Sequence, residues 1–312
     1  MTITQLKYVL AVAEHQNFTK AAEKCFVTQP TLSMQIQKLE DQLDVQIFDR
    51  SKKPIELTEI GQKIVMQSKN IVNEADRIND IVDQQKGFIG GEFKIGIIPT
   101  VMPTLLPMFL KTFIKRYPKI KLKIEELTTE EIIQRIKDGH LDAAIAATPL
   151  KNEHIKERVL FYEPFVGYIP DNHRLASKEV LDVSDLDVND LLLLEDGHCF
   201  RDGVLNLCNA KKTKDRDEFQ LQSGSFEMLT KLANEGMGMT LLPYLHTLDL
   251  KANEQERLHY FSEPSPAREV SLIFHKSELK IQIIDALHKI ISGIIRGAIA
   301  FQNVDIISPV PK

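Results

Sequence analysis

Apolar positions recur every three or four residues through the first 45 residues, which is the spacing of one face of an α-helix. The spacing predicts helices over residues 4–15, 19–25 and 30–43. Thr19 is placed to cap the second helix, and Pro30 suits the first turn of the third, where its missing N–H costs nothing. The third helix is predicted to turn four apolar side chains inward: Leu32, Ile36, Leu39 and Leu43.

Two short helices joined by a tight turn at 27–29 indicate a helix-turn-helix, whose second helix carries polar side chains outward. A two-stranded hairpin is predicted over 47–58, with the basic cluster Arg50–Lys53 at its tip. Such side chains hydrogen-bond base edges and phosphates. The candidate DNA-binding residues are therefore Thr28, Gln29, Pro30, Thr31, Ser33, Gln35, Lys38, Arg50, Lys52 and Lys53. The alternative is a plain three-helix bundle with a solvated polar face.

The net charge of the chain does not by itself indicate nucleic-acid binding. The net charge is −5, and the first 58 residues carry seven basic and seven acidic side chains. Any DNA binding must therefore rest on where the charges lie, as in the basic cluster of the hairpin.

Residues 59–86 read as one long helix with a seam of period 3.5, whose members are Ile64, Ser68, Ile71, Ala75, Ile78 and Val82. This period predicts a short coiled coil and hence a homodimer, which would place two recognition helices on a pseudo-palindromic site. The alternative is an amphipathic helix packed on its own domain. Gly87, Gly90 and Gly91 are predicted to end the helix and form a hinge.

From residue 92 the pattern alternates between strands and helices, which predicts an α/β domain with a largely parallel sheet. The predicted strands are 93–98, 120–126, 141–146, 165–169 and 269–274, and residues 236–243 are predicted to form a turn into a further strand. The predicted helices are 103–117, 129–137, 226–234 and 279–300. Thr100 and Thr129 follow strand ends, where ligands of such sheets bind, and Thr129 is also well placed as an N-cap. Residues 303–312 read as a loose tail.

Composition narrows the class of protein. Apolar residues make up 43% and charged residues 27% of the 312 residues, which is ordinary for globular domains. A run of about 18 apolar residues is lacking and no signal peptide is evident, so we expect a cytoplasmic protein without a membrane span. Three cysteines do not make a secreted disulfide framework.

Two of those cysteines lie in the stretch 194–208. Cys199 has His198 on one side and Arg201 and Asp202 on the other. A cation such as Arg201 stabilises a thiolate, whereas Asp202 opposes it unless the two residues pair. If the segment to Cys208 were one helix, the two Cα atoms would lie roughly 13 Å apart, but a disulfide needs roughly 4.4–6.8 Å.

The two sulfurs therefore lie either across a tight loop or at positions that only local refolding can join. Three other interpretations remain at this point: inert buried thiols, a permanent disulfide, or a zinc site, which lacks a fourth ligand and a CxxC motif.

The N-terminal sequence resembles the signature of LysR-type transcriptional regulators. The matching residues are Phe18, Ala21, Ala22, Thr28, Gln29, Pro30, Thr31, Leu32, Ser33, Gln35, Ile36, Leu39, Glu40, Leu43, Phe48 and Arg50. Asp44 stands where glycine is usual, and Cys25 where leucine is common. The resemblance implies a winged helix-turn-helix domain (1–58), a linker and dimerisation helix with hinge (59–90) and a regulatory domain (91–302).

The same resemblance implies a periplasmic-binding-protein-like regulatory domain of two α/β subdomains joined by crossing strands. Subdomain I would comprise about 91–163 and 268–302, and subdomain II about 164–267, followed by a flexible tail at 303–312.

The run Gly197-His198-Cys199, with Arg201-Asp202 and Cys208, is similar to the redox motif of the peroxide-sensing OxyR subgroup of that family. The similarity implies that Cys199 is the peroxidatic and Cys208 the resolving cysteine, joined in a reversible disulfide that remodels residues 200–220. It implies that Thr100, Thr129, His198 and Asp202 hold peroxide and move protons while Arg201 lends positive charge.

The implied function is transcriptional activation of antioxidant genes, and not enzymatic turnover. The implied partners are operator DNA, hydrogen peroxide, RNA polymerase, a thiol reductant and further copies of the chain in a dimer and tetramer, with no metal and no cofactor. One alternative is a LysR-type regulator that binds a small organic effector in the interdomain cleft. Another is a thiol peroxidase, which gains nothing from the helix-turn-helix.

Overall fold

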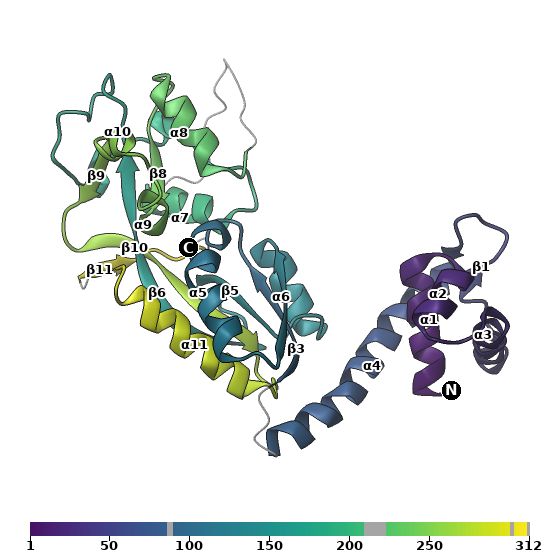
Figure 1. Cartoon of the computed structure of the whole chain (residues 1–312). Helices are drawn as coiled ribbons and strands as arrows, with labels where there is room; N and C mark the ends of the chain where they lie inside the picture. Colours follow the sequence, from purple (N-terminus) through teal and green to yellow (C-terminus); the bar gives the residue numbers. More distant parts are fainter. Residues whose placement is uncertain (86–89, 209–222, 300–302, 311–312) are drawn as a thin grey trace. The chain divides into compact units, whose positions relative to one another are not determined.

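The computed structural model describes residues 1–85, 90–208, 223–299 and 303–310, drawn as coloured ribbon in Figure 1. The chain divides into two compact units, Met1–Phe88 and Ile89–Lys312. Several predicted positions lie outside the described residues, namely Lys86, Gly87, Ala300, residues 209–220 of the remodelled segment and residues 311–312 of the tail.

The first unit is a helix-turn-helix with a hairpin wing and a long helix, as predicted. Its elements are α1 (Ile3–His15), α2 (Phe18–Lys24), α3 (Gln29–Leu43), β1 (Phe48–Asp49), β2 (Glu56–Leu57) and α4 (Glu59–Gln85). The wing strands pair antiparallel, with Phe48 opposite Leu57. Leu32, Ile36 and Leu39 of α3 are fully buried in the core of this unit, which confirms the 3.6-residue pattern.

Two local predictions in this unit are wrong. Asn17, and not Thr19, caps α2, because its side-chain oxygen accepts hydrogen bonds from the backbone N–H groups of Thr19 and Lys20 at 2.9 and 3.0 Å. Leu43 is 39% exposed, because α3 ends there and the buried position in its last turns belongs to Glu40.

The long helix α4 changes character along its length. Val65, Ser68 and Val72 are buried against the helices of its own unit, so the first half follows the alternative of an amphipathic helix packed on its own domain. Ile78 and Val82 in the second half are exposed. The predicted seam is therefore divided. Its first residues are buried or half-buried within the first unit, and its last residues are exposed to solvent.

The start of α4 is tied to the wing. The Thr58 hydroxyl donates to the carbonyl oxygen of Gln46 at 2.6 Å and accepts from the N–H of Gly61 at 2.9 Å. A Cβ at Gly61 would lie 2.0 Å from the Ile47 carbonyl oxygen, so only glycine allows this approach.

The second unit is built on a nine-stranded sheet in the order β4-β3-β5-β10-β6-β9-β7, with β11 beside β10 and β8 beside β6. Its strands are β3 (Gly91–Ile97), β4 (Ile120–Glu126), β5 (Ala143–Thr148), β6 (Ile155–Tyr168), β7 (Val180–Leu181), β8 (Thr240–Pro243), β9 (Leu258–Phe261), β10 (Ser265–His275) and β11 (Val304–Ile306). Its helices are α5 (Met102–Arg116), α6 (Thr129–Lys137), α7 (Cys199–Leu207), α8 (Phe226–Asn234), α9 (Tyr244–Thr247), α10 (Ala252–Gln255) and α11 (Ile281–Ile295), with short 3-10 turns at Val183–Asp185 and Val188–Asp190.

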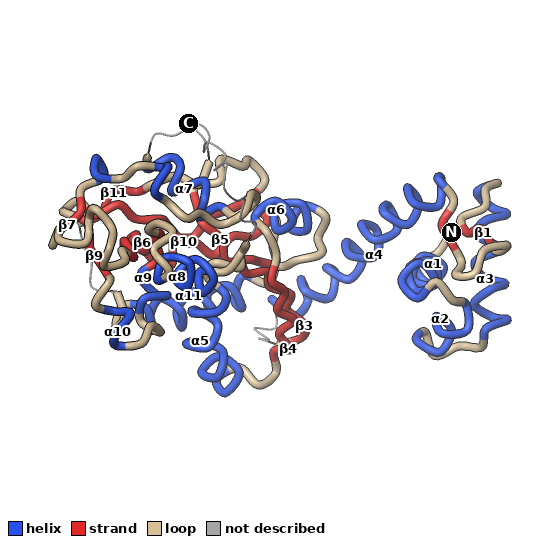
Figure 2. Tube along the Cα trace, turned by 90° about the horizontal axis from the view of Figure 1, so that it is seen from above, coloured by secondary structure: helices blue, strands red, loops and turns tan. Residues whose placement is uncertain are grey.

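Two subdomains share this sheet, and two strands cross between them. β3 pairs parallel with β4 and β5, while α5 and α11 pack on one face and α6 on the other (Figure 2). β6 pairs antiparallel with β10 in the first subdomain and then with β8 and β9 in the second. Each subdomain has its own apolar core. The predicted α/β class with crossing strands is confirmed. The sheet is mixed and not largely parallel as predicted, because β10 runs antiparallel to β5 and β6, and β6 runs antiparallel to β8 and β9.

The predicted loose tail is wrong for its described part. β11 pairs parallel with β10, and the Asn206 side chain of α7 donates to the carbonyl oxygens of Ser308 and Val310 at 2.8 and 3.3 Å. The C-terminal segment is therefore hydrogen-bonded to the helix that begins at Cys199. Among the helices of the described ranges, none is long and apolar enough to cross a membrane.

Candidate functional site

Cys199 is the first residue of α7. Figure 1 shows this helix between α8 of the second subdomain and α6 of the first. The Cys199 side chain is buried in the apolar core of the first subdomain, whereas Phe200, Val204 and Leu207 of the same helix belong to the core of the second. A change at this sulfur therefore acts on both cores at once.

Burial raises the pKa of the Cys199 thiol, and four neighbours modify this effect. The Arg268 guanidinium, the Thr129 hydroxyl and the backbone at Ala147 lower the pKa of the thiol, whereas the Asp202 carboxylate raises it. Thr129 Oγ1 is buried and has no other hydrogen-bond partner among the described residues. The N-cap of α6 is Thr128 and not Thr129 as predicted, which leaves the Thr129 hydroxyl available to the sulfur.

Arg268 is a site residue that the sequence prediction missed. Its guanidinium pairs with the Glu163 carboxylate at 2.7 Å, and both side chains are almost completely buried. It donates to the Thr100 hydroxyl at 2.9 Å and to the Thr100 carbonyl oxygen at 3.0 Å. Its guanidinium carbon also lies 5.1 Å from the centre of the Phe200 ring. The Arg268 guanidinium thus links its own strand, β10, to β6, to the turn after β3 and to α7.

A signal for Arg268 was present in the sequence. Glu163 follows the apolar stretch Val159–Tyr162, and Arg268 follows Ala267; the two residues lie opposite each other in the register of β6 and β10. Charged residues in the middle of buried strands occur almost only as pairs, but the register that joins residues 105 positions apart is not visible in the sequence.

Asp202 is expected to oppose the thiolate unless it pairs with Arg201, and Arg201 forms its ion pair with another carboxylate. The Arg201 guanidinium pairs with Asp196 at 3.0 Å and donates to the Leu194 carbonyl oxygen at 2.9 Å. Its charge lowers the pKa of Asp202, but burial and the Asp196 carboxylate outweigh it and leave that pKa raised. Arg201 therefore holds the preceding loop, and Arg268 takes the place that was predicted for it beside the sulfur.

His198 is the N-cap residue of α7 and is buried, with its Nε2 atom 3.6 Å from the Glu195 carboxylate. Gly224 leaves the room for its ring, because a Cβ at that position would lie 2.9 Å from His198 Nε2 and 3.2 Å from the Glu195 carboxylate. The imidazole next to Cys199 therefore occupies space that depends on Gly224, a residue outside the motif.

Cys208 caps the other end of α7, and all three cysteines of the chain are free thiols. Burial, helped by the Asp187 carboxylate, raises the pKa of Cys208 to about 11. The nine helical residues from Cys199 separate the two Cα atoms by roughly 13 Å, about twice the disulfide range. The two thiols can therefore meet only if α7 unwinds. Within the described ranges, the structure holds no group of three or more His, Cys, Asp and Glu side chains suited to a metal ion.

The predicted DNA-binding residues lie on one stretch around α3 and the wing. Most are exposed, and Ser33 and Gln35 are half-buried. Thr28 is the N-cap of α3, and its hydroxyl oxygen lies 2.8 Å from that of Thr31. Asp44, which stands where glycine is usual, has a φ of +52°, the left-handed conformation that glycine adopts most readily and aspartate tolerates. The turn after α3 is therefore kept in spite of the substitution.

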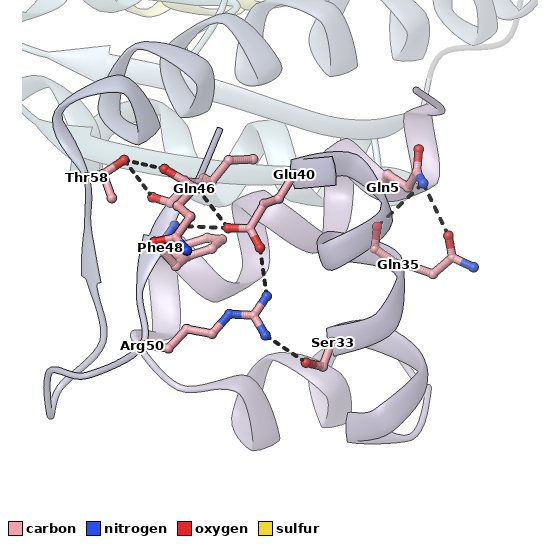
Figure 3. A network of polar contacts seen from close by, with 9 residues as sticks. Gln5, Ser33, Gln35, Glu40, Gln46, Phe48, Arg50 and Thr58 are labelled. Atoms are coloured by element: carbon pink, nitrogen blue, oxygen red, sulfur yellow. Dashed lines mark hydrogen bonds and ion pairs between the residues drawn. The ribbon is translucent and has the colours of Figure 1, made fainter. Parts of the chain in front are cut away.

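Arg50 occupies a network between α3 and the wing (Figure 3). Its guanidinium pairs with the Glu40 carboxylate at 2.8 Å, donates to the Ser33 hydroxyl at 3.4 Å and lies 5.1 Å from the centre of the Phe18 ring. Glu40 also accepts from the backbone N–H groups of Ile47 and Phe48, so it fixes the wing to α3. The sequence prediction gave Arg50 to DNA and overlooked this internal role of Glu40.

Comparisons with known proteins agree with this architecture. The family of bacterial regulatory helix-turn-helix proteins of the LysR type matches residues 3–62, and the LysR substrate binding domain matches residues 86–292. A hydrogen peroxide-inducible genes activator from Pectobacterium carotovorum subsp. carotovorum is 35% identical over 276 residues, covering 88% of this chain and 90% of the relative. The DNA-binding transcriptional dual regulator OxyR of Escherichia coli (strain K12) is 34% identical over 274 residues, covering 88% and 89%.

Solved structures give the same picture. A full-length OxyR from Pseudomonas aeruginosa with a cysteine-to-aspartate substitution superposes with a TM-score of 0.74 at 33% identity, covering 94% of this chain and 98% of that one. A hydrogen-peroxide-bound OxyR cysteine mutant from Corynebacterium glutamicum gives 0.64 at 26% identity, covering 100% and 98%. The chain belongs to the LysR-type family of transcriptional regulators, and within that family it belongs to the OxyR group.

Proposed function

We propose that this chain is a hydrogen-peroxide-sensing, DNA-binding regulator of antioxidant genes, switched by a reversible disulfide between Cys199 and Cys208. The observation that carries the proposal is the placement of the two thiols. Cys199 is buried beside Thr129 and Arg268 at one end of α7, and Cys208 caps the other end of the same helix. Chemistry at one end therefore decides whether the helix can persist.

The first chemical step is attack of the Cys199 thiolate on one oxygen of hydrogen peroxide. The S–O bond forms as the O–O bond breaks, which leaves a sulfenic acid and a hydroxide ion that takes up a proton. Arg268 favours the thiolate, and the Thr129 hydroxyl is placed to hold the peroxide beside the sulfur. Thr100 orients Arg268. His198 and Asp202 flank Cys199, and we assign proton transfer to them.

The second step joins the two cysteines. After α7 unwinds, the Cys208 sulfur attacks the Cys199 sulfenic acid, the S–O bond breaks and water leaves with the thiol proton. Two equivalents of a thiol reductant return the pair to the reduced state. Each signal thus consumes one peroxide, and the chain acts as a sensor and not as a turnover catalyst.

The output is DNA binding by the first unit. We assign base and phosphate contacts to the exposed polar residues of α3 and to Lys52 and Lys53 of the wing, with Arg50 positioned by Glu40 and Ser33. Residues 1–58 would form the DNA-binding domain, 59–90 the linker and 91–302 the sensor. Two chains joined through α4 would read a pseudo-palindromic operator, and dimers would pair in a tetramer that contacts RNA polymerase.

The test compares single cysteine variants on a duplex that the wild-type chain selects from a random-sequence pool. Cys199→Ser is expected to bind this duplex with unchanged affinity and to lose every change in footprint on adding peroxide. Cys25→Ser, in the first unit, is the matched control and keeps the peroxide response. A normal response from Cys199→Ser would refute the proposal.

A further inference from the structure

Phe26, between α2 and α3, is the most exposed large apolar side chain in the described residues, at 95% of its accessible surface. The next, Met66 and Ile78, are each 63% exposed. Solvated single apolar residues are common on protein surfaces, but a whole phenyl ring in water forgoes a large burial free energy.

The backbone makes the choice of phenylalanine more unusual. Phe26 has a φ of +56°, in the left-handed region. The N–H of Phe26 donates to the Glu23 carbonyl oxygen at 3.1 Å and the N–H of Val27 to that of Ala22 at 3.0 Å. These two bonds are the Schellman ending of a helix, in which the left-handed residue is usually glycine because a Cβ is disfavoured there. Phenylalanine is thus unfavourable here in both backbone and side chain.

The position of the ring suggests what it contacts. Phe26 lies two residues before Thr28, the N-cap of α3, and is followed by the exposed Gln29 and Pro30. In helix-turn-helix proteins the N-terminal end of the recognition helix enters the major groove, so the turn before it lies at the groove edge. The exposed Phe26 therefore lies directly before the residues that we propose to meet DNA.

We propose that the Phe26 ring packs on the deoxyribose of the DNA strand that borders the major groove, and so contributes affinity that depends on neither base sequence nor salt. A deoxyribose presents C–H surface to an apolar ring. Because the ring carries no charge, its contact releases no counterions, in contrast to a lysine on a phosphate. The inference rests on the proposed DNA binding and names a further residue of that interface.

The test uses the full reduced chain, with a duplex selected by the wild type from a random pool and an unrelated duplex of equal length. Phe26→Gly, which removes the ring and suits the left-handed backbone, is expected to weaken binding to both duplexes by about five- to tenfold. The slope of log affinity against log salt should be unchanged. Phe26→Asn should behave like Phe26→Gly, since asparagine also tolerates this backbone, whereas Phe26→Leu should retain part of the affinity.

Two controls separate this contact from other effects. Lys52→Ala should weaken binding and lower the salt slope by about one, as loss of a phosphate contact does. Hydrogen exchange of α2 and α3 amides in Phe26→Gly should be as slow as in the wild type or slower, which shows that the turn is intact.

Unchanged affinity of Phe26→Gly for both duplexes, or a loss confined to the selected duplex, overturns the proposal. A wild-type chain that binds neither duplex would instead contradict the proposed DNA binding itself.

Discussion

At the scale of single residues, the reactivity of Cys199 depends on a balance between burial and one guanidinium. Burial alone keeps the thiol protonated, and a protonated thiol does not attack peroxide. Arg268 offsets part of that effect, but its charge is itself stabilised by Glu163. The pKa of the thiol therefore depends on its burial and, next, on Arg268, whose partner Glu163 lies on a different strand.

Arg268 variants separate this electrostatic role from a structural one. Arg268→Met alone leaves Glu163 buried without its cation and is expected to lower the free energy of unfolding by about 3–5 kcal/mol. Arg268→Met combined with Glu163→Gln should recover much of that stability. Because the thiolate loses the Arg268 cation in both variants, peroxide should oxidise Cys199 about tenfold more slowly at neutral pH, as stopped-flow thiol consumption would show. Wild-type rates in the stable double variant would contradict the assigned role.

Cys208 should show its raised pKa directly. A thiol with a pKa of about 11 stays protonated through neutral and mildly alkaline pH, so its alkylation rate in the reduced chain should rise about tenfold per pH unit and not level off below pH 10. In the urea-unfolded chain the rate should level off near the ordinary pKa of about 8.5. Peptide mapping after timed iodoacetamide pulses measures both profiles. A plateau near pH 8.5 in the folded chain would show that Cys208 is not buried.

At the scale of elements, hydrophobic periodicity predicts helices whose caps and apolar stripes lie within their own sequence. The bounds of α6 and α8 agree with the predicted 129–137 and 226–234, because each helix has a cap and an apolar stripe of its own. The short strands β7, β9 and β11 were missed, since two to four residues carry no period and gain their pairing from distant strands. The hydrogen bond from Asn206 to the C-terminal segment could not be predicted either, because it joins residues that are distant in the sequence.

Arg201 and Arg268 show the same limit within the site. The motif predicts a reactive segment around Cys199, and this stays a prediction. It assigned the cation to the nearest arginine in sequence, whereas the folded chain supplies one from β10. Contacts between β6 and β10 join residues that are far apart in the sequence, so the spacing of residues along the chain does not predict them.

Breaking α7 should release the C-terminal segment. Asn206 lies between the two cysteines and donates to the carbonyl oxygens of Ser308 and Val310. When α7 unwinds to form the disulfide, the Asn206 side-chain amide is no longer held in position for these hydrogen bonds. Oxidation should therefore speed hydrogen exchange both in α7 and in residues 303–310, while the α5 amides stay protected. Unchanged exchange at 303–310 in the oxidised chain would show that the segment is held independently of α7.

At the scale of the whole molecule, α4 presents Ile78, Ile81 and Val82 to solvent, at 63%, 50% and 43% exposed. Three neighbouring apolar side chains on the far half of a helix fit an interface with a second copy. Ile78 and Val82 belong to the predicted seam, and Ile81 adds to the apolar surface beside them.

Ile78→Asp should weaken self-association of the chain and, with it, binding to a two-site duplex, while leaving the fold of the first unit intact. Val72→Ala is the matched control, because Val72 is 7% exposed and packs within its own unit. That variant should lower stability by about 1–3 kcal/mol without directly removing the interface. Sedimentation velocity and thermal unfolding distinguish the two effects. Identical oligomers from Ile78→Asp and wild type would place the interface elsewhere.

The central claim joins these scales, since one peroxide at one sulfur must unwind one helix. The most direct measurement adds near-stoichiometric hydrogen peroxide to the reduced full chain, alkylates the remaining thiols and maps all cysteines by mass spectrometry. We expect rapid formation of a Cys199–Cys208 disulfide, with Cys25 recovered in its alkylated form. Recovery of all three cysteines as alkylated thiols would contradict the account and would favour a regulator that answers to a small organic effector.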